Sequence, residues 1–129
     1  MPSNHAVIAA HYAASAAGDL AGMLAPLGED TRWTEAAGFP CAGTYIGPEA
    51  VKENVFLALQ RIFDGYTLTV DEVIDAGEVQ IGIGTYSGTH RTTGKSFRAR
   101  VVHIWRLTDG TVTSFEQITD TLMVDRSMH

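Results

Sequence analysis

A carboxylate near the end of the chain stands where an apolar side chain would be expected. In the stretch Phe115–Thr121 (FEQITDT), the two-residue alternation of a β-strand puts Asp120 on the same face as Ile118. Ile118 is suited to a core, whereas a buried carboxylate is costly unless its charge or its proton is used. Because burial raises the pKa of a carboxylic acid, such a group can exchange a proton near neutral pH. Asp120 is therefore the first candidate for general acid–base chemistry.

Three other predicted elements place polar, mostly ionisable side chains on faces that are expected to point inward. They are Glu35 on a short strand, His103 on a longer strand, and His11 and Tyr12 on the apolar stripe of the first helix. Taken singly, such a residue is usually a hydrogen-bonded part of the core. Together with Asp120 they predict a polar spot inside an apolar cavity, which is the usual form of a small-molecule site. The apolar wall of this cavity is predicted to comprise Trp33, Phe39, Tyr45, Phe56, Val101, Trp105 and Ile118.

The spacing of apolar residues predicts the elements that carry these side chains. In the first half of the chain, helical spacing predicts helices over Asn4–Ala17, Leu20–Ala25 and 48–63, a short strand over 31–36 and a loop over 37–47. The period then becomes two, and the predicted strands cover residues 66–75, 78–88, 96–107 and 111–120. Helices that precede an antiparallel meander predict an α+β fold with the helices on one face of a curved sheet.

The last predicted strand contains one break in its alternation. Val112, Phe115 and Ile118 are three residues apart, so strict alternation cannot place all three on one face. A single β-bulge would bring them together and would bend the strand. The same bulge would turn Glu116 away from the cavity.

Composition limits the kind of protein and the kind of partner. The chain has 129 residues, of which 45% are hydrophobic and 19% charged, which predicts one globular domain over residues 1–129. A net charge of −6 argues against nucleic acid or an anionic membrane as a partner. With one cysteine and five histidines that lack paired spacing, we expect no disulfide, no metal and no cofactor. The absence of a recognisable leader or an apolar span predicts a cytoplasmic protein.

Three stretches of the sequence resemble the nuclear transport factor 2-like superfamily, in its ketosteroid isomerase and SnoaL-like branches. They are HYAASAAGDLAGMLAPLGEDTRWTE (11–35), YIGPEAVKENVF (45–56) and VVHIWRLTDGTVTSFEQITDT (101–121). The resemblance implies a cystatin-like α+β cone, in which a curved antiparallel sheet wraps around three N-terminal helices. The superfamily hosts isomerases, cyclases, epoxide hydrolases and binding proteins without activity, so the fold alone does not decide the function.

The resemblance also implies roles for individual residues. Glu35 falls where ketosteroid isomerases carry the Asp base, and His103 where they carry a protonated Asp in the oxyanion hole. His11 falls at the position of their oxyanion-hole tyrosine, with Tyr12 beside it. Asp120 matches the general acid/base of SnoaL-like polyketide cyclases. The inward arginine of the Asp-Arg-Asp set in limonene epoxide hydrolases has no counterpart that we can place.

We therefore predict a pocket for an apolar small molecule and an isomerase, cyclase or lyase of SnoaL type that uses no cofactor. The predicted substrate is an apolar, polyketide- or steroid-like carbonyl compound, and the predicted catalytic residues are Asp120, His103 and Glu35. The alternatives are a ligand-binding module of the same fold without catalysis and an epoxide hydrolase-like enzyme. Val102 and Ile104, set among arginines on the outer sheet face, predict a homodimer through that face.

Overall fold

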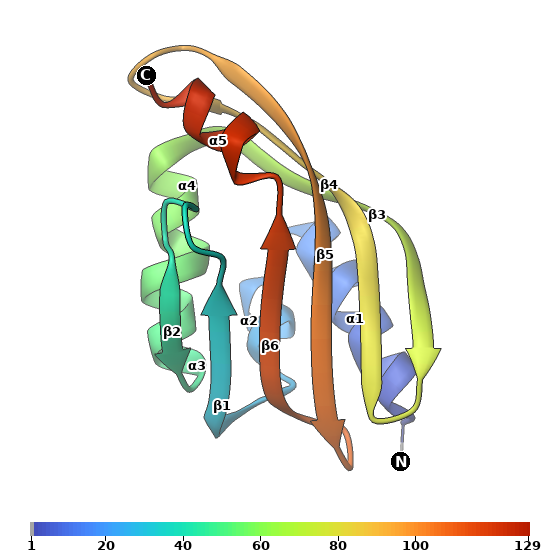
Figure 1. Cartoon of the computed structure of the whole chain (residues 1–129). Helices are drawn as coiled ribbons and strands as arrows, with labels where there is room; N and C mark the ends of the chain where they lie inside the picture. Colours follow the sequence, from blue (N-terminus) through green and yellow to red (C-terminus); the bar gives the residue numbers. More distant parts are fainter. Residues whose placement is uncertain (1) are drawn as a thin grey trace.

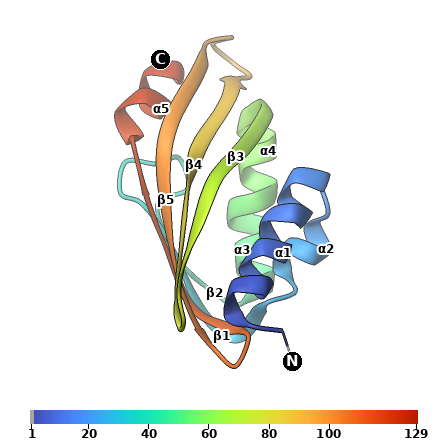
Figure 2. The same cartoon turned by 90° about the vertical axis from the view of Figure 1, so that its right-hand side faces the viewer.

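The computed structural model describes residues 2–129, so Met1 of the predicted domain lies outside the described residues. The helices of the first half of the chain pack on one face of a strongly curved, open sheet, whereas the C-terminal helix lies on its other side (Figures 1 and 2). The helices are α1 (Asn4–Ala17), α2 (Leu20–Leu24), α3 (Pro48–Val51), α4 (Leu57–Ile62) and α5 (Thr121–Ser127), and a π-helical turn, η1 (Lys52–Phe56), joins α3 to α4. The strands are β1 (Leu27–Glu35), β2 (Gly43–Ile46), β3 (Phe63–Ala76), β4 (Val79–His90), β5 (Ser96–Thr108) and β6 (Thr111–Thr119).

The sheet has the strand order β2-β1-β6-β5-β4-β3. Neighbouring strands run antiparallel except β1 and β6, which pair in parallel. The predicted α+β cone is confirmed, but the prediction of an antiparallel sheet is wrong for this pair. The parallel pairing is sterically allowed because β1 and β6 are far apart in the chain, and the intervening helices and strands form the long connection that parallel strands need.

Local sequence signals explain the ends of the helices. The Ser3 side chain accepts a hydrogen bond from the backbone N–H of Ala6 and caps α1, and Gly18 ends this helix with a left-handed φ of 70°. Asp19 caps α2 in the same way through the N–H of Gly22. The predicted helix over Asn4–Ala17 is confirmed. Sequence analysis did not predict β2 and α5, which are both short; β2 lies in a segment rich in turn residues, and α5 follows the last strand directly.

A bulge lies in β6 as predicted, but it does not bring all three apolar residues to one face. The register with β5 shifts between Arg106 and Leu107, and this shift lets both Val112 and Phe115 be buried. Ordinary alternation then resumes, so that Gln117 is buried while Glu116 is exposed and Ile118 is 51% exposed. The placement of Ile118 in the cavity wall is therefore wrong, whereas the outward position of Glu116 is confirmed.

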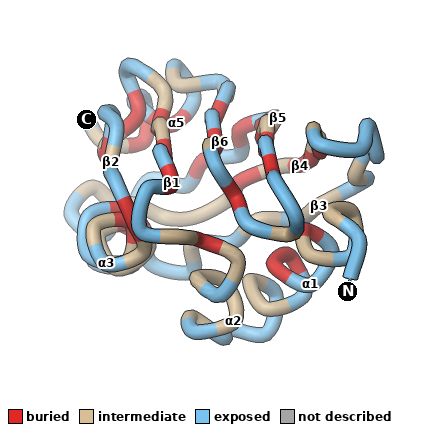
Figure 3. The backbone as a smooth tube through the Cα atoms, turned by 90° about the horizontal axis from the view of Figure 1, so that it is seen from below, coloured by how far each residue is buried: buried red, intermediate tan, exposed pale blue. Residues whose placement is uncertain are grey.

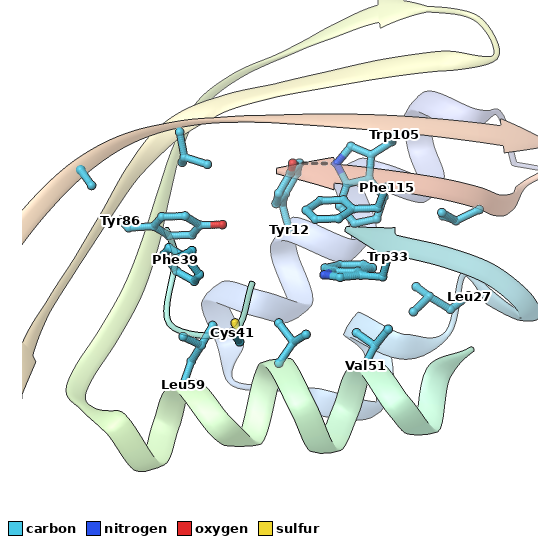
Figure 4. Packing of buried hydrophobic residues seen from close by; sticks show 14 of the residues in the cluster. Tyr12, Leu27, Trp33, Phe39, Cys41, Val51, Leu59, Tyr86, Trp105 and Phe115 are labelled. Atoms are coloured by element: carbon cyan, nitrogen blue, oxygen red, sulfur yellow. Dashed lines mark hydrogen bonds between the residues drawn. The ribbon is translucent and has the colours of Figure 1, made fainter. Parts of the chain in front are cut away.

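Buried residues recur along the strands and on α1 (Figure 3). The centre of the core is a cluster of aromatic rings in which Trp33, Trp105 and Phe115 each contact the other two (Figure 4). The ring centroids are 3.7 Å apart for Trp33 and Phe115 and 4.6 Å apart for Trp105 and Phe115. Stacked and edge-to-face rings of this kind add to the stability that their burial supplies. Two of these residues, Trp33 and Phe115, also line the cavity between the helices and the sheet.

Candidate functional site

A partly open cavity of about 510 Å³ lies between the helices and the inner face of the sheet. Its size is typical of small-molecule sites. Apolar residues make up much of its wall, and its polar lining includes His11, Glu35, Tyr66, Tyr86 and His103. A second hollow of about 640 Å³, between α5 and the start of β5, is lined mainly by exposed side chains and is open to solvent. The first cavity is the better candidate because it brings buried ionisable groups together.

Glu35 is the carboxylate that faces this cavity. It is the last residue of β1 and is only 3% exposed, two residues after Trp33 on the same face of the strand. Burial raises the pKa of Glu35 to about 7, against smaller opposing effects of the Cys41 thiol and the Trp33 indole N–H. The Trp33 indole N–H lowers the pKa of Glu35 slightly but makes no hydrogen bond of normal geometry. Near neutral pH, Glu35 is thus divided between its acid and its base form.

Cys41 holds Glu35 from the loop between β1 and β2. Its thiol donates a hydrogen bond to Oε1 of Glu35 over 3.3 Å. The Tyr45 hydroxyl donates to the backbone carbonyl of Cys41 at 2.9 Å and so fixes the loop. Burial and the neighbouring carboxylate raise the pKa of the thiol, which keeps it in the S–H form. One Glu35 oxygen is therefore held by the protein, and the carboxyl group has a defined orientation.

A hydrogen-bonded array stands on the strand side of the cavity. His103 lies between two tyrosines, with Nδ1 2.8 Å from the Tyr12 hydroxyl and Nε2 2.6 Å from the Tyr86 hydroxyl. Trp105 donates its indole N–H to Tyr12 (Figure 4), and Gln117 donates an amide N–H to Tyr86. Burial lowers the pKa of His103 to about 3, so the ring is neutral at physiological pH. Both ring nitrogens are occupied, so His103 has no free N–H for a ligand.

His11 also faces the cavity and is neutral. Its Nδ1 donates to the backbone carbonyl of Met23 at 2.9 Å, and burial lowers its pKa to about 4. The tautomer that this bond selects leaves Nε2 as an acceptor. His11 therefore cannot supply the oxyanion donor that its position in the resemblance implied.

Asp120 lies outside the cavity, contrary to the sequence-based prediction. It is exposed, and its carboxylate accepts a hydrogen bond from the backbone N–H of Met123 at 3.3 Å, which makes it the N-cap of α5. The alternation that resumes after Phe115 sends Ile118 outward, and the chain then turns into the helix. Capping a helix fully explains a carboxylate at this point. Asp120 is withdrawn as a catalytic candidate.

The remaining predicted residues divide into three groups. The cavity is lined by His11, Trp33, Glu35, Phe56 and His103. Buried in the core beside the cavity without lining it are Tyr12, Phe39, Val101 and Trp105. Tyr45 is half-exposed on β2 and acts on the site only through Cys41.

Sequence analysis missed Tyr66, Tyr86 and Gln117. Tyr86 shares the inner face of β4 with Gly82 and Gly84, and strict alternation along this strand could have found it. Gly82 leaves room for the first helix, since a Cβ atom there would lie 2.0 Å from the Tyr12 hydroxyl oxygen. Tyr66 and Gln117 gave no signal of their own, because their burial depends on strand register.

Comparison with known proteins places the chain in a family. The model of the SnoaL-like domain matches residues 8–115. The chain belongs to the SnoaL-like family. No protein of curated function matches it. Within residues 2–129 of this SnoaL-like protein, no helix is long and apolar enough to cross a membrane, and no group of three His, Cys, Asp or Glu side chains is arranged to hold a metal ion.

Solved structures extend the comparison over the whole chain. An NTF2-like protein from Burkholderia thailandensis is 49% identical with a TM-score of 0.98, covering 100% of this chain and 99% of that one. An NTF2-like protein from Burkholderia pseudomallei is 31% identical with a TM-score of 0.88 and 98% of each chain covered. TerC, co-crystallised with polyporic acid, is 29% identical with a TM-score of 0.85 and 97% of each chain covered.

The buried Glu35 carboxyl should make stability fall as the pH rises. Its pKa is raised from 4.5 to about 7, so the folded protein keeps this proton to higher pH than the unfolded chain does. The free energy of unfolding therefore decreases between these two values, by at most about 3 kcal/mol. Glu35→Gln removes this term and is expected to be more stable than the wild type at pH 8, with the advantage lost near pH 4.5. Urea denaturation at pH 8 and pH 4.5 measures the free energy of unfolding of both proteins. An equal difference between variant and wild type at the two pH values would contradict the prediction.

Proposed function

We propose that this SnoaL-like protein binds an apolar carbonyl compound in its cavity and moves a proton on the carbon next to the carbonyl group, with Glu35 as acid and base. The observation that carries the proposal is the buried Glu35 carboxyl with a pKa near 7, facing the same cavity as the tyrosine hydroxyls. A base of this pKa is matched to proton transfer at physiological pH. The reaction is that of an isomerase or cyclase without a cofactor.

The proposed reaction begins with a proton transfer from carbon to Glu35. The carboxylate of Glu35 takes the proton from the carbon atom, and the electron pair of the broken C–H bond forms an enolate. Hydroxyl donors in the cavity stabilise the negative oxygen, an effect that is large where the donors are shielded from water. Glu35 then returns the proton to another carbon in an isomerisation. In a cyclisation, the enolate carbon attacks a second carbonyl, and Glu35 gives the proton to the alkoxide oxygen that this attack forms.

The shape and chemistry of the cavity support a ligand of this class. Its wall includes Phe56, Leu59 and Leu68, which favour apolar ring systems, and its volume fits a molecule of several rings. The similarity to TerC, which was co-crystallised with polyporic acid, also supports a small-molecule ligand. The described wall contains no arginine, so we do not propose the epoxide hydrolase reaction.

Deuterium exchange tests the proposed function without knowledge of the natural substrate. The protein is incubated in D₂O with 2-tetralone, a bicyclic ketone with acidic C–H bonds, and incorporation of deuterium is followed by NMR. We expect the wild type to accelerate exchange above the buffer rate and Glu35→Gln to fail to do so. Binding of 2-tetralone without faster exchange would overturn the catalytic proposal and leave a ligand-binding protein, the second candidate.

We also propose that the protein forms a homodimer through the outer face of the sheet. Val102 and Ile118 are register partners on β5 and β6, so their side chains are neighbours on one face, and Ile118 is 51% exposed. Ile118→Asp is expected to give a monomer in sedimentation at micromolar concentration, whereas Ala10→Asp, at an exposed position of α1 on the opposite side of the sheet, should leave the dimer intact. A monomeric wild type would contradict the proposal.

A further inference from the structure

The hydrogen-bonded array around His103 ends in groups that can only donate. Trp105 has an indole N–H and no acceptor, and it donates to the Tyr12 hydroxyl at 2.8 Å. At the other end, the backbone N–H of Ala36 donates to Oε1 of Gln117 at 3.1 Å. This contact fixes the orientation of the Gln117 amide, so the group that faces Tyr86 is its NH₂, at 2.9 Å. Each tyrosine oxygen therefore already accepts one hydrogen bond.

Counting protons within the array leaves one hydroxyl proton unused. Neutral His103 has one N–H and one bare nitrogen, so it donates to one tyrosine and accepts from the other. The tyrosine that donates to His103 has used its proton. The tyrosine that accepts from His103 accepts twice, and its own O–H is free. The tautomer of His103 thus decides whether the free O–H belongs to Tyr12 or to Tyr86.

The two tautomers have different consequences for a ligand. With the proton on Nδ1, the free hydroxyl is that of Tyr12, which lies against Gly82 and Trp105 and does not line the cavity. With the proton on Nε2, the free hydroxyl is that of Tyr86, which does line it. Figure 4 shows the Tyr86 hydroxyl pointing toward Tyr12, and the ring of His103 bonds to both hydroxyls between them.

Tyr66 supplies a second hydroxyl next to Tyr86. It lines the cavity, and its ring centroid lies 5.3 Å from that of Tyr86. Its hydroxyl oxygen is shielded from water and, among the contacts of residues 2–129, makes no hydrogen bond of normal geometry, although it is near enough to the Tyr86 hydroxyl for the two groups to affect each other's pKa. A buried hydroxyl without a partner is costly, which a ligand acceptor would relieve.

We infer that Tyr66 and Tyr86 together bind one oxygen atom of the ligand, and that His103 is a positioning residue whose Nε2–H tautomer directs the Tyr86 proton toward that oxygen. The ligand class is a ring compound with a carbonyl, enolate or phenolate oxygen. Burial raises the pKa of both tyrosines, so both are protonated donors throughout the physiological range. The inference rests on the ligand cavity of the proposed function and not on proton transfer by Glu35.

A matched pair of ligands tests the oxygen site. 2-Naphthol carries one oxygen, and naphthalene has the same rings without it. We expect Tyr86→Phe and Tyr66→Phe each to weaken 2-naphthol binding on the order of 10-fold, while naphthalene affinity changes less than about 2-fold. A purely structural role would weaken both ligands equally. An unchanged ratio of the two affinities in both folded variants would overturn the site.

The tautomer of His103 is tested separately by nitrogen-15 NMR of the imidazole ring. We expect the bound 2-naphthol complex to show a protonated Nε2 and a bare Nδ1. A protonated Nδ1 in that complex would overturn the role of His103. The affinity and NMR measurements record binding alone. They can support the oxygen site even if Glu35→Gln leaves deuterium exchange unchanged, and they can contradict the oxygen site even if Glu35 proves to be the base.

Discussion

Replacing Glu35 with glutamine is expected to lower the rate of proton exchange on a bound carbon acid by roughly 10²–10⁴-fold, the usual contribution of a general acid or base. Glutamine has nearly the same shape and can still accept the hydrogen bond that the Cys41 thiol donates. Ligand affinity should therefore change little, and the loss should appear in kcat rather than in KM. The expected gain in stability at pH 8 separates this loss from misfolding. Such an exchange of stability against activity is common at active sites.

Asp120→Asn is the matched control for Glu35→Gln. Asp120 is exposed and caps α5, and asparagine is as good a helix cap as aspartate. We therefore expect the Asp120→Asn variant to keep its exchange activity and its free energy of unfolding. Exchange that is lost in Asp120→Asn and retained in Glu35→Gln would show that the cavity carboxylate has been misassigned.

Gly82→Ala is expected to lower the free energy of unfolding by about 2–6 kcal/mol. A Cβ atom at this position would lie 2.0 Å from the Tyr12 hydroxyl oxygen and 2.7 Å from Cζ of the same ring, so α1 or the ring must move. Overpacking of this kind costs about 1–3 kcal/mol. Movement of Tyr12 also breaks its contacts with Trp105 and His103, and a buried donor left without a partner costs about 1–3 kcal/mol more.

Gly28→Ala serves as the control for Gly82→Ala. A Cβ atom at Gly28 would meet the methyl group of Thr111 at 3.2 Å, at the half-buried start of β1, where a small shift relieves the contact. We expect this variant to remain within about 1 kcal/mol of the wild type. Urea denaturation compares the two proteins. If Gly82→Ala were also within that range, the close packing of Tyr12 on β4 would not be needed for stability.

Several parts of this protein can be predicted from sequence because their cause is local. Ser3 and Gly18 set the ends of α1 through contacts within a few residues, and the turn at Asp109 and Gly110 is specified by their tolerance of positive φ. Alternation along β5 correctly placed His103 on the inner face. The same local patterns, together with the quoted stretches, were enough to predict the family and the α+β cone.

The site itself required the tertiary structure, because its members are selected by strand register and by burial. Glu35 and Asp120 are both carboxylates at the end of a strand, and nothing in their neighbouring residues says which one is enclosed. The shift in register between β5 and β6 sends Gln117 inward and Ile118 outward, and the chain then turns so that Asp120 caps α5. On β1, the loop that carries Cys41 closes over Glu35 and removes it from water, which is what raises its pKa. Sequence alone thus determined which residues were available for chemistry. Only the packing of distant segments decided which of them face the cavity, because desolvation depends on everything that surrounds a group rather than on its neighbours in the chain.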